Sequence, residues 1–120
     1  MSKQAIIIDV DGTLADVEHR VHHVKTKPKD WKAFHGSLEK DRPNQWCVEL
    51  IRAFREKDFF IILLTGRNDQ YIEKSKKWLE FHSIEYDELH MRNSKDNRSD
   101  HEFKKELYLQ KIKTHYDVLF

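Results

Sequence analysis

Two apolar runs, each followed by a short polar segment with a glycine, constrain the fold of this chain most strongly. Residues 5–8 (Ala-Ile-Ile-Ile) lead into Asp-Val-Asp-Gly-Thr at 9–13, and residues 59–64 lead into Thr-Gly-Arg at 65–67. Short apolar runs rich in isoleucine, leucine and phenylalanine are typical of strands that are buried on both faces. We therefore expect a parallel sheet in which these two strands are neighbours.

Helical patterns alternate with the apolar runs. Pro43 is expected to open a helix, because the first helical position needs no backbone N–H. Alternating strands and helices predict an α/β fold, a three-layer Rossmann-like parallel sheet with helices on both faces. The expected helices are 43–57, 69–82 and 100–114, and the further expected strands are 87–91 and one beginning at 118.

Length and composition fit one globular domain over residues 1–120. The chain is 38% hydrophobic and 36% charged, which is enough for one modest core. Residues 15–41 are polar and are expected to form a small cap-like insertion with a short helix near 29–35. Two aromatic residues in it, Trp31 and Phe34, have two open interpretations: they stack on a base, or they anchor the insertion to the core.

Charge and cysteine content exclude several classes of protein. The formal net charge of +1 argues against a protein that is held to nucleic acid by bulk charge. The single cysteine, Cys47, cannot form an internal disulfide, and its apolar helical surroundings favour a core position in a reducing compartment. Because no apolar run is long enough to cross a membrane, we expect no membrane partner and a cytoplasmic location.

Two carboxylates one residue apart, Asp9 and Asp11, follow the first strand. In α/β sheets ligands bind at the carboxyl ends of the strands. The two negative charges repel each other unless a cation compensates them, and Mg²⁺ prefers hard oxygen ligands together with phosphate oxygens. An EF-hand is disfavoured, because counting from Asp9 its glycine and glutamate positions hold Leu14 and Arg20. A solvated Asp-Gly turn stays open as the alternative.

Polar side chains also follow the other strands. Thr-Gly-Arg at 65–67 offers a hydroxyl, a close backbone approach and a guanidinium suited to phosphate, although an ordinary turn is equally open. A lysine of the last helix, Lys104 or Lys105, adds a positive charge. A zinc site is not favoured, because no cysteine or further ligand cluster accompanies the candidate residues. Those candidates are Glu18, His19, His22 and His23.

These segments, in this order and at these distances, resemble the haloacid dehalogenase-like phosphatase superfamily over nearly the whole chain. The matching motifs are Asp-Val-Asp-Gly-Thr at 9–13, Leu-Leu-Thr-Gly-Arg at 63–67 and Lys-Lys-Glu at 104–106. Within the superfamily, residues 91–100 are similar to the phosphatase domain of phage-type polynucleotide kinase. That family has two arginines six residues apart, then an acid and a lysine, which here are Arg92, Arg98, Asp100 and Lys104. A solvated polar turn is the alternative for this loop.

The resemblance implies a role for each matching residue. Asp9 would attack phosphorus and form an aspartyl-phosphate. Asp11 would protonate the leaving alcohol and then activate water. Mg²⁺ would be bound by the Asp9 side chain and the Asp11 backbone carbonyl. Thr65 and Lys104 would hold phosphoryl oxygens. The implied substrate-binding residues are Gly66, Arg67, Arg92 and Arg98.

The superfamily's fourth motif, an acidic pair beyond the last core strand, has no counterpart before Phe120. The resemblance therefore implies a domain that is shortened at its C-terminus, with a magnesium site that lacks one ligand. Asp96 and Asp100 lie on the neighbouring loop and are not expected to fold inward to replace it. An uncovered sheet edge at 118–120 favours a homodimer or another partner.

The function expected from the sequence is a Mg²⁺-dependent phosphomonoesterase that removes a 3′-phosphate from a polynucleotide or a nucleotide. A short insertion at 15–41 leaves an open site, which suits the end of a polymer. Two alternatives remain. One is a small-molecule phosphatase that acts on nucleotides, and the other is a shortened, non-catalytic relative that binds phosphate or a partner.

Overall fold

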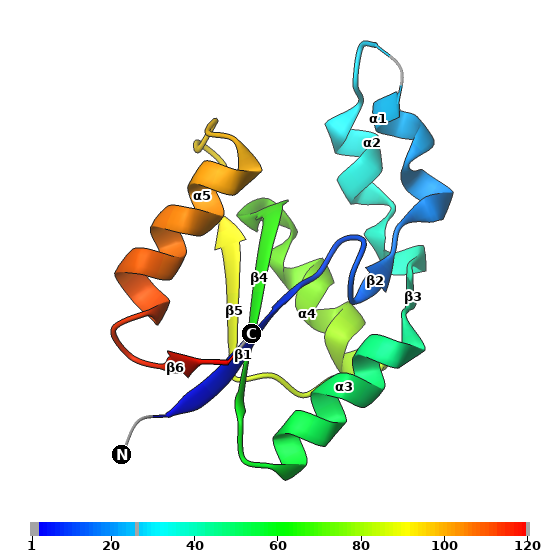
Figure 1. Cartoon of the computed structure of the whole chain (residues 1–120). Helices are drawn as coiled ribbons and strands as arrows, with labels where there is room; N and C mark the ends of the chain where they lie inside the picture. The colour runs from blue at the N-terminus through cyan, green and yellow to red at the C-terminus, as the bar shows by residue number, and fades with distance from the viewer. Residues whose placement is uncertain (1–2, 26, 120) are drawn as a thin grey trace.

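A parallel sheet lies at the centre of the protein (Figure 1). The structure is a computed structural model that describes residues 3–25 and 27–119. Within these residues the central sheet has the strand order β5-β4-β1-β6, and all its pairings are parallel. The strands are β1 (Gln4–Asp9), β4 (Phe60–Asn68), β5 (Glu88–Arg92) and β6 (Asp117–Val118). The prediction that the two long apolar strands are neighbours is confirmed, with Ala5 opposite Phe60.

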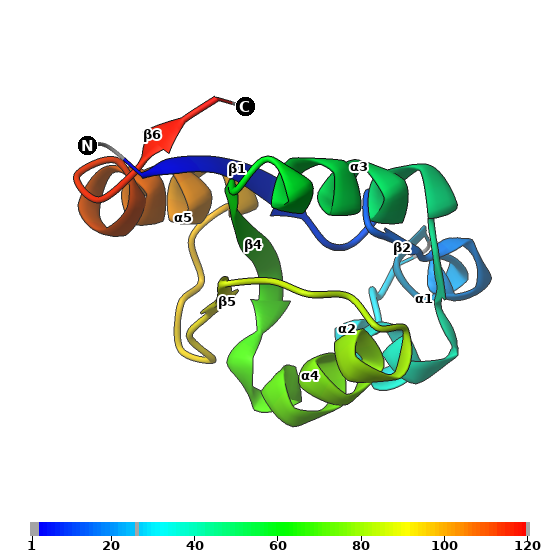
Figure 2. The same ribbon diagram turned by 90° about the horizontal axis from the view of Figure 1, so that it is seen from below.

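Helices cover both faces of the sheet. One face packs on α3 (Gln45–Glu56) and α4 (Ile72–Phe81), whereas the other packs on α5 (Asp100–Leu107) and the π-helical turn Tyr108–Ile112 (Figures 1 and 2). Successive strand residues point to opposite faces. Ile6 and Ile8 therefore enter the core under α3 and α4, while Ala5 contacts the core under α5. The predicted three-layer α/β fold is confirmed.

The start of α3 differs from the prediction. Pro43 does not open the helix, because Arg42–Pro43 forms a short strand, β3, that pairs antiparallel with β2 (Ala15–Asp16). The helix begins two residues later, after Asn44. The Asn44 side chain donates to the carbonyl of Thr13 at 2.7 Å, which ties the start of α3 to the turn after β1.

The insertion (residues 15–41) contains more regular structure than the sequence predicted. It holds the 3-10 helices Glu18–Arg20 and Leu38–Lys40, and also α1 (His22–Lys25) and α2 (Trp31–Gly36). Asp30 caps α2 by accepting a hydrogen bond from the Ala33 N–H. In Figure 1 the helices α1 and α2 stand near the carboxyl ends of β4 and β5.

The two aromatic residues of the insertion have different environments. Phe34 is 7% exposed, whereas Trp31 is 51% exposed. Phe34 therefore anchors the insertion, and Trp31 stays accessible.

Strand β4 runs further than predicted. Thr65, Gly66 and Arg67 lie inside it and not in a turn after it. The pairing with β5 is irregular here: Leu64 lies opposite His90, and the next pair joins Asn68 to Arg92. Because more residues of β4 than of β5 occupy this interval, the strand bulges and its backbone stays extended.

The bounds of the remaining helices and strands lie closer to the predicted ones. The 3-10 helix Asp69–Tyr71 precedes α4, and α5 ends before the π-helical turn. The predicted fourth strand is present as β6, and Phe120 lies outside the described residues. Cys47 is buried and unpaired in the core. In the part of the chain that the structure describes, every helix is too short or too polar to cross a bilayer.

Candidate active site

A tight turn after β1 fixes the positions of Asp9 and Asp11. The Ala15 N–H donates to the Val10 carbonyl at 2.8 Å, and the Gly12 N–H donates to the Ala15 carbonyl at 2.9 Å. Gly12 has φ of +84°, a conformation that residues with a Cβ adopt with strain. The turn leaves the two carboxylates at the carboxyl end of the strand, where they face different partners.

Asp9 is paired with a lysine of α5. Lys104 Nζ lies 3.0 Å from Asp9 Oδ1, and the Val10 N–H donates to the same oxygen at 2.9 Å. Burial raises the pKa of Asp9 and outweighs the hydrogen bond and charge of Lys104, which lower it. Of the two lysines considered from the sequence, the structure places Lys104 at the site and leaves Lys105 exposed.

Asp100 also reaches the site, contrary to the sequence-based expectation. It is the first residue of α5, and its Oδ2 lies 3.0 Å from Lys104 Nζ. The approach is possible because position 66 is glycine: a Cβ there would lie 1.9 Å from Asp100 Oδ1. Lys104 therefore bridges two carboxylates, Asp9 and Asp100.

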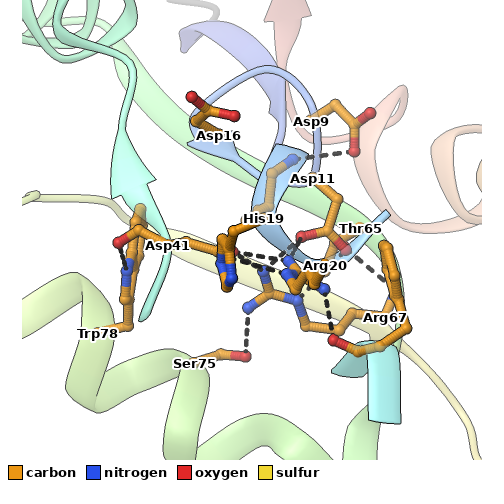
Figure 3. Close-up of polar contacts among 12 residues, drawn as sticks. Asp9, Asp11, Asp16, His19, Arg20, Asp41, Thr65, Arg67, Ser75 and Trp78 are labelled. Atoms are coloured by element: carbon orange, nitrogen blue, oxygen red, sulfur yellow. Dashed lines mark hydrogen bonds and ion pairs between the residues drawn. The ribbon is translucent and has the colours of Figure 1, made fainter. Parts of the chain in front are cut away.

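Asp11 turns toward two arginines (Figure 3). Its Oδ1 accepts from Arg20 Nη2 at 2.8 Å and from Arg67 Nη2 at 2.5 Å. Burial acts to raise the pKa of Asp11, but the charges and hydrogen bonds of Arg67 and Arg20 outweigh it and hold the pKa below its usual value. The arginines thus favour the ionised carboxylate.

Arg20 and Asp41 form a buried ion pair that the sequence did not reveal. Arg20 Nε and Nη2 donate to the two carboxylate oxygens of Asp41 at 2.8 and 2.7 Å. His19 Nε2 lies 2.5 Å from Asp41 Oδ1, and Trp78 Nε1 donates to the Asp41 carbonyl at 2.9 Å (Figure 3). This network connects the insertion to Asp11 on one side and to α4 on the other.

Thr65 and Arg67 lie at the bulge of β4, and both are buried. The Arg67 N–H donates to Thr65 Oγ1 at 3.1 Å, and Arg67 Nη1 donates to Ser75 Oγ on α4 at 2.8 Å. In this structure the guanidinium group that was expected to bind substrate phosphate is held by Asp11 and Ser75.

Arg92 and Arg98 lie at opposite ends of the loop before α5. Arg92 Nη1 donates to the Arg98 carbonyl at 2.8 Å. The guanidinium of Arg98 contacts Asp96 Oδ2 at 2.6 Å and also forms an ion pair with Glu106. These contacts order the loop, and the acidic partners compete with any phosphate for Arg98.

All the residues predicted for the site line one cleft of about 740 Å³. The cleft extends from the insertion across the ends of β1 and β4 to the loop before α5. The sequence-predicted residues that line it are Asp9, Asp11, Thr65, Gly66, Arg67, Arg92, Arg98 and Lys104.

The oxygen atoms at the end of β1 suit magnesium better than zinc. Among the described residues no three His, Cys, Asp or Glu side chains are arranged to hold a metal ion. Mg²⁺ commonly takes only one or two carboxylates and fills its remaining positions with water and phosphate oxygens. The Asp9 carboxylate at the end of β1 is an oxygen ligand of this kind.

Comparison with known proteins agrees with this geometry. Residues 3–120 match the family described as the polynucleotide kinase PNKP phosphatase domain. A chain in the structure of the Pnkp1/Rnl/Hen1 RNA repair complex is 30% identical, with a TM-score of 0.83 over 99% of this chain. The class C acid phosphatase from Bacillus anthracis with tungstate bound is 18% identical, with a TM-score of 0.73 over 100% of this chain and 51% of its own.

The fold and the family match define a haloacid dehalogenase-type phosphatase domain. The chain belongs to the family of polynucleotide kinase phosphatase domains. It spans 35% of the length of the matched chain in the RNA repair complex, and 38% of the matched chain in a second structure, of the Pnkp1/Rnl/Hen1 complex, which is also 30% identical.

Proposed function

We propose that this protein is a Mg²⁺-dependent phosphomonoesterase that works through an aspartyl-phosphate and removes a 3′-phosphate from a polynucleotide or nucleotide. The observation that carries the proposal is the pairing of Asp9 with Lys104, 3.0 Å apart, while Asp11 is held separately by Arg20 and Arg67 in the same cleft. Two adjacent carboxylates with different partners suit a nucleophile and a proton-transfer group.

In the first step an Asp9 carboxylate oxygen attacks phosphorus, and the bond from phosphorus to the ester oxygen breaks. Asp11 gives its proton to the departing oxygen, so the alcohol leaves neutral. This step needs Asp11 in its protonated form, which the arginines oppose. Substrate phosphate oxygens that bind Arg67 compete with Asp11 for the guanidinium and so raise the proton affinity of Asp11.

In the second step the Asp11 carboxylate takes a proton from water. The water oxygen attacks phosphorus, the bond from phosphorus to Asp9 breaks, and inorganic phosphate leaves. Arg20 and Arg67 favour the ionised form of Asp11 that this step begins with. Lys104 donates to the phosphoryl oxygens in both steps, because its ammonium group is already within hydrogen-bonding distance of Asp9.

The Asp9 carboxylate and the Asp11 carbonyl would hold Mg²⁺. When bound, the ion reduces the repulsion between the attacking carboxylate and the phosphate. Asp100, which is paired with Lys104 at 3.0 Å, would add negative charge to this part of the cleft. The residues of the chain then position the phosphoryl group: Thr65 from β4 and Lys104 from α5.

A nucleic-acid end is the proposed substrate because the cleft is open and two arginines, Arg92 and Arg98, line it. Guanidinium groups suit the phosphates that flank the end of a chain. A protein with a similar chain is part of an RNA repair complex. A nucleotide phosphatase is the second candidate, favoured by the volume of the cleft, about 740 Å³, which is larger than a phosphoryl group needs.

We also propose that residues 1–120 act as one phosphatase domain with 15–41 as its cap-like insertion. The cytoplasmic location and the pairing of two copies through the β6 edge stay predictions.

The test is phosphate release from three substrates with Mg²⁺: a 3′-phosphorylated oligonucleotide, its 5′-phosphorylated counterpart and an aryl phosphate. We expect the first to be hydrolysed with the highest kcat/KM, and addition of EDTA to stop the reaction. Asp9→Asn should abolish release. Asp58→Asn, an exposed position with φ of 64° that asparagine tolerates, is the matched control. Full activity of Asp9→Asn would overturn the mechanism, and a preference for the 5′-phosphate would overturn the substrate.

A further inference from the structure

Aromatic side chains form part of the cleft that contains Asp9 and Asp11. Trp31 and His35 come from α2, and Tyr71 comes from the 3-10 helix that follows β4. The rings of Trp31 and His35 are stacked at 24° with centroids 6.0 Å apart, and the rings of His35 and Tyr71 lie 5.3 Å apart. We call Trp31, His35 and Tyr71 the aromatic subsite.

Packing within the insertion uses only part of the Trp31 ring, which lies edge-on to Phe34 with the centroids 5.7 Å apart. Phe34 is the buried anchor of α2, and the guanidinium of Arg20 lies over its ring at 4.3 Å. Trp31 is 51% exposed although it is one of the largest apolar side chains of the insertion. An exposed ring beside a polar cleft has surface available for a ligand.

The charge of His35 also favours a stacking role. Burial is the main cause that lowers the pKa of His35 to about 4, and Arg67, Arg20 and Arg92 lower it further against the opposing effect of Asp11. The ring is therefore uncharged at neutral pH. Its Nδ1 atom is buried and makes no hydrogen bond within the described residues.

We propose that the aromatic subsite receives the nucleobase of the nucleotide whose phosphate is removed. The inference rests on the proposed function, since it assumes that the phosphate lies at Asp9. A cleft of about 740 Å³ is far larger than a phosphoryl group needs. The cleft brings cationic side chains and flat aromatic rings together, which suits the phosphate and the base of one nucleotide. Stacking on aromatic rings accepts any of the bases.

A binding experiment tests the subsite without turnover. In an Asp9→Asn background, isothermal titration calorimetry compares adenosine 3′-phosphate with inorganic phosphate. We expect adenosine 3′-phosphate to bind more tightly, and Trp31→Ala to weaken it roughly tenfold while phosphate binding stays unchanged. Trp31→Phe should retain most of the affinity. Trp46→Ala is the control, because Trp46 is 61% exposed on α3 and does not line the cleft.

Activity measurements separate this inference from the proposed function. The substrates are 3′-phosphorylated oligonucleotides whose terminal residue carries a base or is abasic. Trp31→Ala should raise KM for the substrate that carries a terminal base and leave KM for the abasic substrate unchanged. Equal effects on both substrates, or no effect on either, would overturn the subsite while phosphate release still supports the phosphatase. If no substrate releases phosphate, the proposed function fails, and the titrations alone decide the subsite. Tighter binding of a phosphotyrosine peptide than of adenosine 3′-phosphate would also overturn the assignment to a nucleobase.

Discussion

Asp9 and Asp11 are separated by one residue, yet their pKa values are shifted in opposite directions. Burial raises the pKa of Asp9, and Lys104 only partly offsets this. Burial acts in the same sense on Asp11, but two arginines outweigh it and lower its pKa. The difference arises from which elements the side chains face: Asp9 faces α5, and Asp11 faces the insertion and β4.

The pH dependence of activity should respond to Lys104. Asp9 must be ionised to attack phosphorus, so activity falls as the pH drops through the raised pKa of Asp9. Because Lys104 lowers that pKa, Lys104→Met should move the acidic limb of the kcat/KM profile to higher pH. The same substitution should also reduce the maximal kcat/KM. The exposed neighbour Lys105, changed to Met, provides the control. An acidic limb that stays in place would show that Asp9 is not the group that titrates.

Asp41→Asn should destabilise the protein and impair catalysis together. Removal of one partner from a buried ion pair costs about 3 kcal/mol or more, because the other charge stays buried. Without the Asp41 carboxylate to position its guanidinium group, Arg20 should also form a weaker hydrogen bond to Asp11. Urea unfolding measures the first effect, and kcat for an aryl phosphate measures the second.

Glu49→Gln is the matched control for Asp41→Asn. Glu49 pairs with Arg52 at 3.3 Å on the exposed face of α3, and such pairs contribute about 0.5 kcal/mol or less. A similar loss of stability in both variants would contradict the structural role that we assign to Asp41.

Gly66→Ala should reduce activity without unfolding the protein. The new methyl group would collide with the Asp100 carboxylate, a side chain that can move away from Lys104. We expect at least a tenfold loss of kcat/KM, equivalent to about 1.4 kcal/mol, with a small change in melting temperature. Gly36→Ala has open space around its Cβ and should leave activity unchanged. A fully active Gly66→Ala would indicate that the position of Asp100 does not matter.

Arg98 and Glu106 should have opposite effects on an oligonucleotide substrate. Arg98→Ala removes a guanidinium from the rim of the cleft and should raise KM for a 3′-phosphorylated oligonucleotide more than for an aryl phosphate. Glu106→Gln removes an acidic competitor of Arg98, so it should lower KM for the oligonucleotide and steepen its salt dependence. If Arg98→Ala impairs both substrates equally, the residue belongs to the phosphoryl site itself.

The central sheet could be predicted from the sequence because its signals are local. An apolar strand needs only a run of neighbouring residues, and the turn after β1 needs only Gly12 and the polar residues beside it. These patterns located Asp9 and Asp11 at the end of the strand. The parallel arrangement then implied that Thr65 would lie nearby, and the family resemblance singled out Lys104.

The Arg20–Asp41 pair could not be predicted in this way. Both residues belong to a polar segment in which a charged side chain is usually solvated, and their burial depends on how the insertion folds back on α4. The position of Asp100 depends on another long-range relationship, the absence of a side chain at Gly66. The extension of β4 depends on its register with β5. Such features follow from tertiary packing and leave no local signal.

The network around Arg20 couples the folding of the insertion to the chemistry of Asp11. Arg20 contacts the Phe34 carbonyl of α2, the Asp41 carboxylate and Asp11. The insertion therefore cannot swing open like a hinged lid without breaking the Arg20–Asp11 ion pair and the hydrogen bond from Trp78 Nε1 to the Asp41 carbonyl. It serves as a fixed wall of the cleft, and substrate has to enter from the open side. Local unfolding of residues 15–41 would remove Arg20 from Asp11 and leave Arg67 as its arginine partner, so a partly unfolded molecule would also have an altered environment at the proton-transfer group that we propose.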